Sequence, residues 1–277
     1  TVEFQVDYDV PVPLEKLADI LENDSDIEHV AIVHHETSSG ILNPLREISK
    51  VCRRYNRYFI VDAMSSYAGA PINVYDDHID YLIASSNKCL HGMPGLAFVI
   101  ANRSALEATE GNARTYYFDL HQQNRSLDKD GVFAFTPPVQ VIYSLKQALL
   151  ALQAEGVEGR IARYHERYDQ LMCGLRDLGF ACVTPNSMES KLLATIQCPN
   201  DHIDFDHMHD ALYRKGYTIY PKKLPIANTF RLAHIGVLKE NDIECFLHES
   251  TLYVTIMTEK SPRAQGDDVS EVRNSHV

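Results

Sequence analysis

The sequence lacks several features that define whole classes of protein. Its 277 residues include 26 Lys and Arg against 38 Asp and Glu, a formal net charge of −12 at pH 7. Such a chain lacks the concentrated basic surface of a general nucleic-acid or anionic-membrane binder, so neither partner is expected. No run approaches the roughly 18 consecutive apolar residues of a membrane span. The first residues, TVEFQVD, contain neither a basic stretch nor an apolar stretch, which predicts that no signal peptide is present.

The six cysteines are scattered and form no CxxC pair. Disulfide frameworks are typical of short secreted chains, and structural zinc sites need closely paired ligands, so neither is expected. Reduced thiols in a cytoplasmic protein without a metal site fit the pattern better. A metal-binding patch is one interpretation of a histidine-rich stretch, although a polar helix face explains the same residues with fewer assumptions. Its residues are Asp201, His202, Asp204, Asp206, His207 and His209.

Short apolar runs alternate with amphipathic stretches in the first half of the chain. We expect helices at 11–23 and 44–55 and strands at 30–33, 58–61, 79–84 and 96–101. The run 30–33 is typical of a strand that is buried on both faces. The alternation predicts an α/β fold with a mostly parallel, helix-covered sheet.

The second half has a different pattern. A long helical stretch at 139–178, broken or bent at Gly156 and Gly159, precedes shorter strands at 192–197, 217–220 and 229–232. We therefore expect a large domain at 1–145 and a smaller α+β domain at 146–258. The apolar content collapses after Glu259, which predicts a disordered tail at 259–277.

Reactive polar residues follow three of the apolar runs: Thr37 with two serines, then Asp62, then Lys88. In an open α/β sheet ligands bind beyond the carboxyl ends of the strands, so these side chains should converge at one edge. A lysine held among apolar strand ends can become a nucleophile toward carbonyls. Pyridoxal phosphate needs such a lysine for a Schiff base and an aspartate at its ring nitrogen. A structural Asp–Lys ion pair remains the alternative.

Three blocks of sequence are recognisable. The stretches HHETSSGILNP (34–44), VDAMSS (61–66) and IASSNKCLHGMPG (83–95) resemble the class V pyridoxal-phosphate aminotransferases of the fold type I superfamily. Shorter matches lie at 135–140, 220–224 and 229–236, and the resemblance extends to about Leu247. The aspartate followed by Asn-Lys marks the superfamily. The full block Asn-Lys-Cys-x-x-Gly-x-Pro-Gly is similar to members of the class that act on 2-aminoethylphosphonate.

The resemblance implies a role for each matching residue. Lys88 would be the Schiff-base lysine and proton shuttle, and Asp62 would pair with the pyridine nitrogen. Thr37 would lie near the phenolic oxygen of the cofactor, while Thr136 would reach the cofactor phosphate of the neighbouring subunit in a homodimer. Arg231 would grip the acid group of the substrate, a role that a guanidinium fork performs for carboxylates and phosphonates alike.

The resemblance further implies transamination between 2-aminoethylphosphonate and pyruvate. Another activity of the class, such as that of an alanine:glyoxylate aminotransferase, is an alternative. Members of the family also carry a Gly-Ser-Gly-Thr-type loop that cradles the cofactor phosphate at a helix N-terminus. The sequence has no such loop, so we expect a large domain truncated at its N-terminus, and an inactive fragment is a further alternative. The residues 253–257 (YVTIM) should interrupt the terminal helix of the family.

Overall fold

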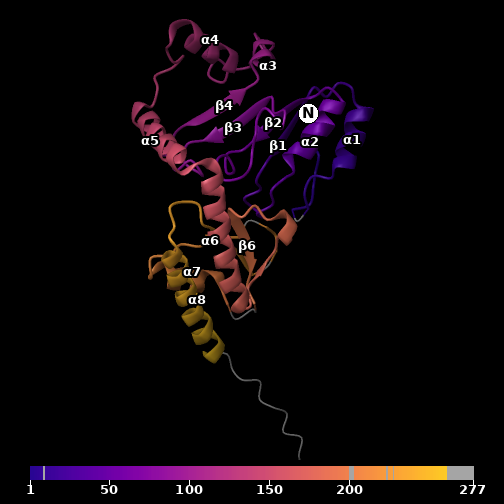
Figure 1. Cartoon of the computed structure of the whole chain (residues 1–277). Coiled ribbons are helices and arrows are strands. Elements are labelled where there is room, and N and C mark those ends of the chain that lie inside the picture. The colour runs from indigo at the N-terminus through magenta and orange to yellow at the C-terminus, as the bar shows by residue number, and fades with distance from the viewer. Residues whose placement is uncertain (9, 200–202, 223, 227, 261–277) are drawn as a thin grey trace, which may run out of the picture.

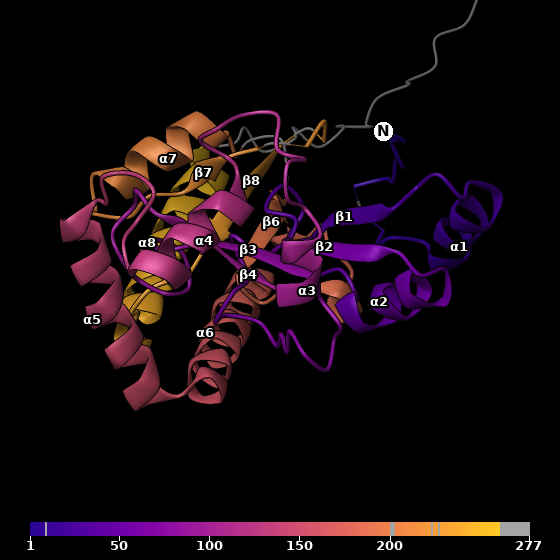
Figure 2. The ribbon, with the colours of Figure 1, turned by 90° about the horizontal axis from the view of Figure 1, so that it is seen from above.

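The computed structural model describes residues 1–8, 10–199, 203–222, 224–226 and 228–260. Four strands form the first sheet in the order β1-β2-β3-β4, and β1, β2 and β3 are parallel. Their bounds are His29–Val33, Tyr58–Asp62, Tyr81–Ser85 and Ala97–Ala101. Figures 1 and 2 place the helices α1 (Leu14–Asn23) and α2 (Leu45–Arg54) toward the β1 end of this sheet. The α/β class and the mostly parallel sheet are thereby confirmed.

Helices α1 and α2 bury one apolar stripe each. In α1, Leu17 and Leu21 are one turn apart and buried, and in α2 Ile48 and Cys52 repeat that spacing. Because side chains four residues apart share a helix face, both stripes reach the core beneath β2 and β3. This packing fixes the sheet whose strand ends carry the candidate site residues.

Strand β4 runs antiparallel to β3, with Ser85 opposite Ala97. Only residues 86–96 connect the two strands. A parallel crossover needs a dozen or more residues and usually a helix, so this short connection, with its turn at 92–95, can only return the chain antiparallel. The sequence pattern marked the strand but not its direction.

The expectation that 30–33 is buried on both faces is wrong. Exposed and half-buried residues alternate along β1, and Val33 is exposed. The reason is topological, because β1 is the edge strand of the sheet among the described residues. An apolar run by itself does not distinguish an edge strand from a central one.

Two short helices connect the first sheet to the long helices that follow. They are α3 (Arg103–Glu107) and α4 (Leu120–Asp130), capped by the side chains of Asn102 and Asp119. Neither helix is predicted by the sequence pattern. Both are largely polar, and α4 buries no residue, so the hydrophobic period that reveals a helix is absent.

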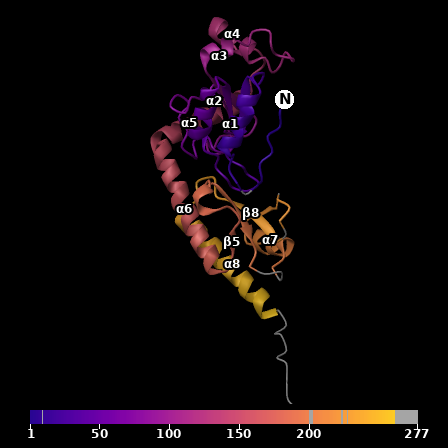
Figure 3. The same cartoon turned by 90° about the vertical axis from the view of Figure 1, so that its right-hand side faces the viewer.

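The predicted long helix is two helices, α5 (Val139–Glu155) and α6 (Val157–Asp177), separated at Gly156. Gly156 has a φ of +80°, which ends α5, whereas Gly159 lies within α6. Figure 2 shows the two helices meeting at this break. In Figure 3, α6 runs along one side of the molecule, from α5 to the level of the second sheet.

The second sheet is antiparallel, with the order β5-β6-β8-β7. Its strands are Ala181–Cys182, Leu193–Gln197, Thr229–Ala233 and Tyr220–Pro221, and a 3-10 turn covers Asn186–Met188. The strand expected at 217–220 is therefore shorter and begins later. Helices α6, α7 (Phe205–Tyr213) and α8 (Glu240–Lys260) supply the apolar residues that cover this sheet. The division into domains at residue 145 falls inside α5 and stays a prediction.

Helix α8 is continuous from Glu240 to Lys260, so the expected interruption at 253–257 is wrong. Tyr253 is buried in the core of the second sheet, and its hydroxyl is 3.0 Å from Nδ1 of His207. These contacts outweigh the weaker helix propensity of aromatic and β-branched residues. Glu259 and Lys260 are helical as well, so the predicted tail begins too early, and 261–277 lie outside the described residues. In the described part of the chain no helix has both the length and the apolar character needed to cross a membrane.

Candidate functional site

The ends of the parallel strands bring three predicted site residues to one edge of the first sheet. Asp62 is the last residue of β2 and is paired with Val33 of β1 and Ile83 of β3. Thr37 follows the end of β1 by four residues, and Lys88 follows the end of β3 by three. The predicted convergence at the carboxyl edge agrees with this topology.

Asp62 presents a carboxylate that is only partly engaged. Its Oδ1 accepts a hydrogen bond of 2.9 Å from the backbone N–H of Met64, which fixes the side chain at the strand end. Within the described chain, its other carboxylate oxygen has no hydrogen-bond partner, and the residue is half-buried. The site therefore offers a free, oriented acceptor for an N–H group.

Lys88 lies on a tight turn that also contains the buried Ser86 and Cys89. The backbone N–H of His91 donates to the carbonyl of Lys88, and that of Gly92 to the carbonyl of Ser86. Ser86 and Cys89 are fully buried, while Lys88 is exposed. The expectation that the lysine is held among apolar strand ends is thus wrong, because β3 ends at Ser85 and the turn carries the amine outward.

The loop after β1 is attached to the second sheet. Thr195 of β6 donates from its hydroxyl to the carbonyl of Ser38 at 2.8 Å, and Arg231 of β8 donates from Nη1 to the carbonyl of Thr37 at 3.0 Å. Gly40 permits the close approach: its φ is +96°, and a Cβ there would lie 2.7 Å from the carbonyl oxygen of Leu193. The structure therefore brings Thr37 and Arg231 together.

Backbone carbonyls orient the guanidinium group of Arg231. Its side chain is nearly buried, its Nε donates to the carbonyl of Pro221 at 3.0 Å, and its guanidinium carbon lies 5.9 Å from the ring centre of Tyr220. Burial lowers the pKa of this guanidinium, and Tyr220 opposes the shift. Since a guanidinium has five N–H donors, the two backbone bonds leave donors for an anion.

Three titratable residues of the first block, for which the sequence predicted no role, lie in the same region. Burial and then the nearby Asp62 raise the pKa of Glu36. His34 contacts the hydroxyl of Ser66 at 2.9 Å, whereas both ring nitrogens of the buried His35 are without a partner in the described residues. Burial lowers the pKa of both histidines to about 4, so both are neutral. The feature of the sequence that marks these three residues is their position between the strand end at Val33 and the predicted site residue Thr37.

Thr136 is not brought together with the other predicted site residues. It is exposed on the segment that precedes α5, and within the described chain it makes no hydrogen bond to Thr37, Asp62, Lys88 or Arg231. A role at this edge would therefore require a second subunit.

A cavity of about 1170 Å³ borders the loop after β1, but Thr37, Asp62, Lys88 and Arg231 are not among the residues that line it. It extends from Glu36, Ser38 and Ser39 along β1 to the N-terminal segment. Apart from this cavity, an exposed amine, a partly free carboxylate and an arginine fork at one edge of the sheet suit a cofactor with an aldehyde and a basic ring nitrogen, as pyridoxal phosphate has.

In the part of the chain that the structure describes, the histidine-rich stretch does not form a metal site. Within the described residues, no three His, Cys, Asp or Glu side chains come together as a group that could hold a metal ion. Asp204 caps α7 by accepting from the backbone N–H of His207, and His209 contacts Asp210. Asp201 and His202 lie outside the described residues.

Comparisons with known proteins agree with this geometry. The profile of the family Aminotransferase class-V matches residues 2–219. A 2-aminoethylphosphonate–pyruvate transaminase of Lysinibacillus sphaericus is 40% identical over 257 residues, which cover 92% of this chain and 70% of that protein. One of Bacteroides fragilis is 40% identical and covers 86% of this chain and 68% of its own length. The crystal structure of a ureidoglycine–glyoxylate aminotransferase of Bacillus subtilis superposes with a TM-score of 0.82 at 22% identity, covering 95% of this chain and 68% of that one.

Proposed function

Because this chain belongs to the class V aminotransferase family, a family of pyridoxal-phosphate enzymes, we propose that it transfers the amino group of 2-aminoethylphosphonate to pyruvate. The products are phosphonoacetaldehyde and L-alanine. The relatives at 40% identity carry the names of these two substrates. The observation that carries the proposal is the bond from Arg231 to the Thr37 carbonyl, because it fixes an acid-binding cation at the edge that holds Asp62 and Lys88.

Each residue at the edge has a separate task. When bound, pyridoxal phosphate would supply an aldehyde that takes up the amino group and an electron-poor ring that stabilises negative charge on the substrate carbon. Lys88 would hold the cofactor covalently and carry a proton on Nζ between substrate and cofactor carbons. The free carboxylate oxygen of Asp62 would keep the ring nitrogen protonated. Thr37 would lie beside the oxygen on the ring.

Arg231 serves both substrates in turn. Its fork binds two oxygens of a phosphonate or a carboxylate, which allows one cation to accept the donor and the acceptor of the amino group. Because two backbone carbonyls already orient the guanidinium, little side-chain freedom is lost when an acid binds.

The proposed reaction is tested by following L-alanine formation from pyruvate by NMR, with 2-aminoethylphosphonate as the donor and pyridoxal phosphate present. We expect alanine to accumulate with the wild-type chain and not with Lys88→Ala. Faster amino transfer from alanine to glyoxylate than from 2-aminoethylphosphonate to pyruvate would assign the chain to another activity of the class. A folded wild-type chain that transfers no amino group would contradict the proposal for this chain.

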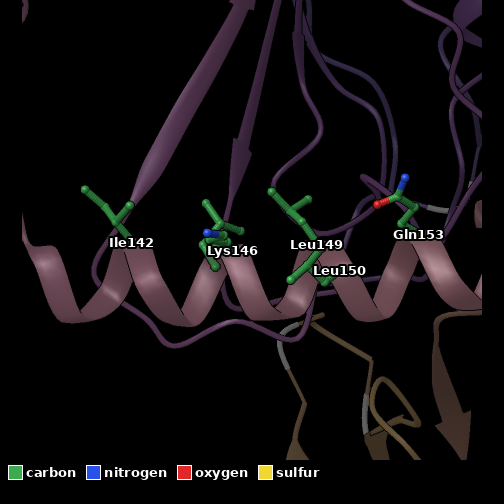
Figure 4. Close-up of a pocket in the computed structure, with 6 residues that line it drawn as sticks. Ile142, Lys146, Leu149, Leu150 and Gln153 are labelled. Carbon is green, nitrogen blue, oxygen red and sulfur yellow. The ribbon is translucent and has the colours of Figure 1, made fainter. Parts of the chain in front are cut away.

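We also propose that the chain forms a homodimer through α5 and the segment before it. A shallow pocket of about 270 Å³ runs along α5 and is lined by four apolar residues together with Lys146 and Gln153, and Figure 4 shows Ile142, Leu149 and Leu150 on this helix. Leu149 and Leu150 are 44% and 49% exposed, which is unusual for leucines so close together. The exposed rings of Tyr116 and Tyr117 pack on the half-buried ring of Phe135, the residue before Thr136. A second copy that covers both patches would bring Thr136 toward the neighbouring cofactor site.

A cytoplasmic location is the remaining part of the proposal. All six cysteines are free thiols, and Cys52, Cys89 and Cys198 are buried. Unpaired cysteines in a chain of this size suit a reducing compartment.

A further inference from the structure

A carboxylate held by two arginines lies at the break between α5 and α6. Glu155 ends α5, and Arg160 and Arg163 lie in the first two turns of α6. The positive φ of Gly156 turns the chain so that both arginines reach back to the carboxylate. A helix dipole disfavours a negative charge at its C-terminus, so the two arginines must offset that cost at Glu155.

Each carboxylate oxygen of Glu155 binds one guanidinium. Arg160 contacts Oε2 with Nε at 2.8 Å and with Nη2 at 2.7 Å, and Arg163 contacts Oε1 with Nε and Nη2, both at 2.8 Å. Burial raises the pKa of Glu155, but the hydrogen bonds from Arg163 and Arg160 outweigh it and hold the pKa below its usual value. The carboxylate is therefore charged and held between two guanidinium groups.

Each arginine uses its remaining nitrogen on a different part of the site. Nη1 of the buried Arg160 donates to the carbonyl of Cys89, the residue after Lys88, at 2.8 Å. Nη1 of Arg163 donates to the carbonyl of Gly236, three residues beyond the strand that carries Arg231, at 2.8 Å. One carboxylate thus joins the turn of the proposed cofactor lysine to the strand of the proposed acid-binding arginine.

Tyr164 connects the same two segments a second time. Its hydroxyl is hydrogen-bonded to Nε2 of His91, on the lysine turn, and its carbonyl lies 3.1 Å from Nε2 of His234, next to β8. Tyr164 and His234 are both buried. The thiol of Cys89 also donates to the carbonyl of Ser65 at 3.4 Å. The turn is therefore held by several contacts while Lys88 itself stays exposed.

We propose that Glu155, Arg160 and Arg163 are positioning residues that fix the turn of Lys88 relative to the strand of Arg231. They touch neither substrate nor cofactor and act through the carbonyls of Cys89 and Gly236. The inference rests on the proposed roles of Lys88 and Arg231, because the cluster links the amine that holds the cofactor to the cation that binds the substrate acid. Loss of the cluster loosens both segments together.

The test is hydrogen–deuterium exchange of the cofactor-free chain, which requires no activity. In Glu155→Gln we expect the amides of residues 86–92 and 234–238 to exchange at least tenfold faster than in the wild type. The matched control is Glu166→Gln, which removes the same charge from an exposed residue of α6 that pairs only with its neighbour Arg167 among the described residues. It should leave both segments unchanged. Arg163→Lys keeps the positive charge but loses the paired N–H donors of the guanidinium group. If Glu155→Gln does not fold, Arg163→Lys takes its place in the same exchange experiment.

A second measurement uses the holoenzyme. With pyridoxal phosphate bound, Glu155→Gln should shift the pH at which the visible absorbance band changes and should raise the KM for 2-aminoethylphosphonate, whereas a lower melting temperature alone would reveal a purely structural role. Unchanged exchange in both segments of the folded variant would overturn the inference. If exchange increases as expected but the wild type transfers no amino group, the positioning role holds and the proposed function fails.

Discussion

Arg231 illustrates how one residue can be prepared for binding before a ligand arrives. Its Nε and Nη1 are bonded to the carbonyls of Pro221 and Thr37, and its side chain is nearly buried. A lysine at this position would keep one positive charge but could not make both backbone bonds and still bind two oxygens of an acid.

Arg231→Lys should therefore raise the KM for 2-aminoethylphosphonate and for pyruvate by about tenfold or more, the effect of losing a charge-assisted hydrogen bond of about 1.5–3 kcal/mol. Steady-state kinetics with each substrate measures the change. Arg103→Lys, on the exposed surface of α3, is the control and should leave both KM values unchanged. If Arg231→Lys leaves them unchanged too, Arg231 does not bind the acid group.

Three buried histidines predict how the stability of the protein depends on pH. Burial is the main cause that lowers the pKa of His34, His35 and His234 to about 4, from about 6.5 in an unfolded chain. Between these values the unfolded chain binds more protons than the folded chain, so acid favours unfolding. One pKa unit corresponds to about 1.4 kcal/mol, so the three residues can account for several kcal/mol.

Urea unfolding at a series of pH values checks this expectation. The free energy of unfolding should fall as the pH is lowered from about 6.5 to about 4, and little of the loss should come from these residues above pH 7. A free energy that stays constant or rises over that range would show that the three histidines are not buried as neutral groups.

At the scale of elements, the loop after β1 depends on a glycine that combines an unusual φ with a close contact. Gly40→Ala should lower the free energy of unfolding by about 2–4 kcal/mol, because it adds a backbone clash at Leu193 to the strain of a positive φ. Gly111→Ala is a matched control, since Gly111 has a φ of +78° with open space around it, and its cost should stay near 1 kcal/mol. Equal losses for the two variants in chemical denaturation would mean that the loop does not pack against β6.

The elements differ in how far the sequence predicts them. Strands β1, β2 and β3 follow from short apolar runs, and the polar residues after them led directly to Asp62 and Lys88. The direction of β4 and the exposure of β1 depend on neighbours in the sheet, which no local pattern records. The continuity of α8 through 253–257 is not visible in the sequence, because tertiary contacts rather than helix propensity hold these residues.

The arrangement of the site is less predictable than its members. The bond between Arg231 and Thr37 joins residues 194 positions apart, and only the packing of the second sheet on the loop after β1 brings them together. The cluster around Glu155 escaped notice because its partners lie across a helix break, at spacings that no regular helix would pair.

At the scale of the whole molecule, the exposed apolar residues of α5 predict the oligomeric state. Light scattering coupled to size exclusion should give twice the chain mass of 31.4 kDa for the wild type and the monomer mass for Leu149→Glu. A buried charge in an interface without a partner is costly, which is why one substitution suffices. Val237→Glu, at another exposed apolar residue outside α5, is the control and should remain dimeric. A monomeric wild type would refute the dimer and the role of Thr136 across it.

The central claim is that the amine of Lys88 holds pyridoxal phosphate at the carboxyl edge of the first sheet, with Asp62 at the ring nitrogen. The most direct measurement is the visible absorbance of the chain titrated with pyridoxal phosphate, followed by borohydride reduction and peptide mass spectrometry. The account predicts a saturable visible band, a cofactor-derived mass on the peptide that contains Lys88, and loss of both in Lys88→Ala. No band at saturating cofactor, or a label on a different lysine, would contradict it.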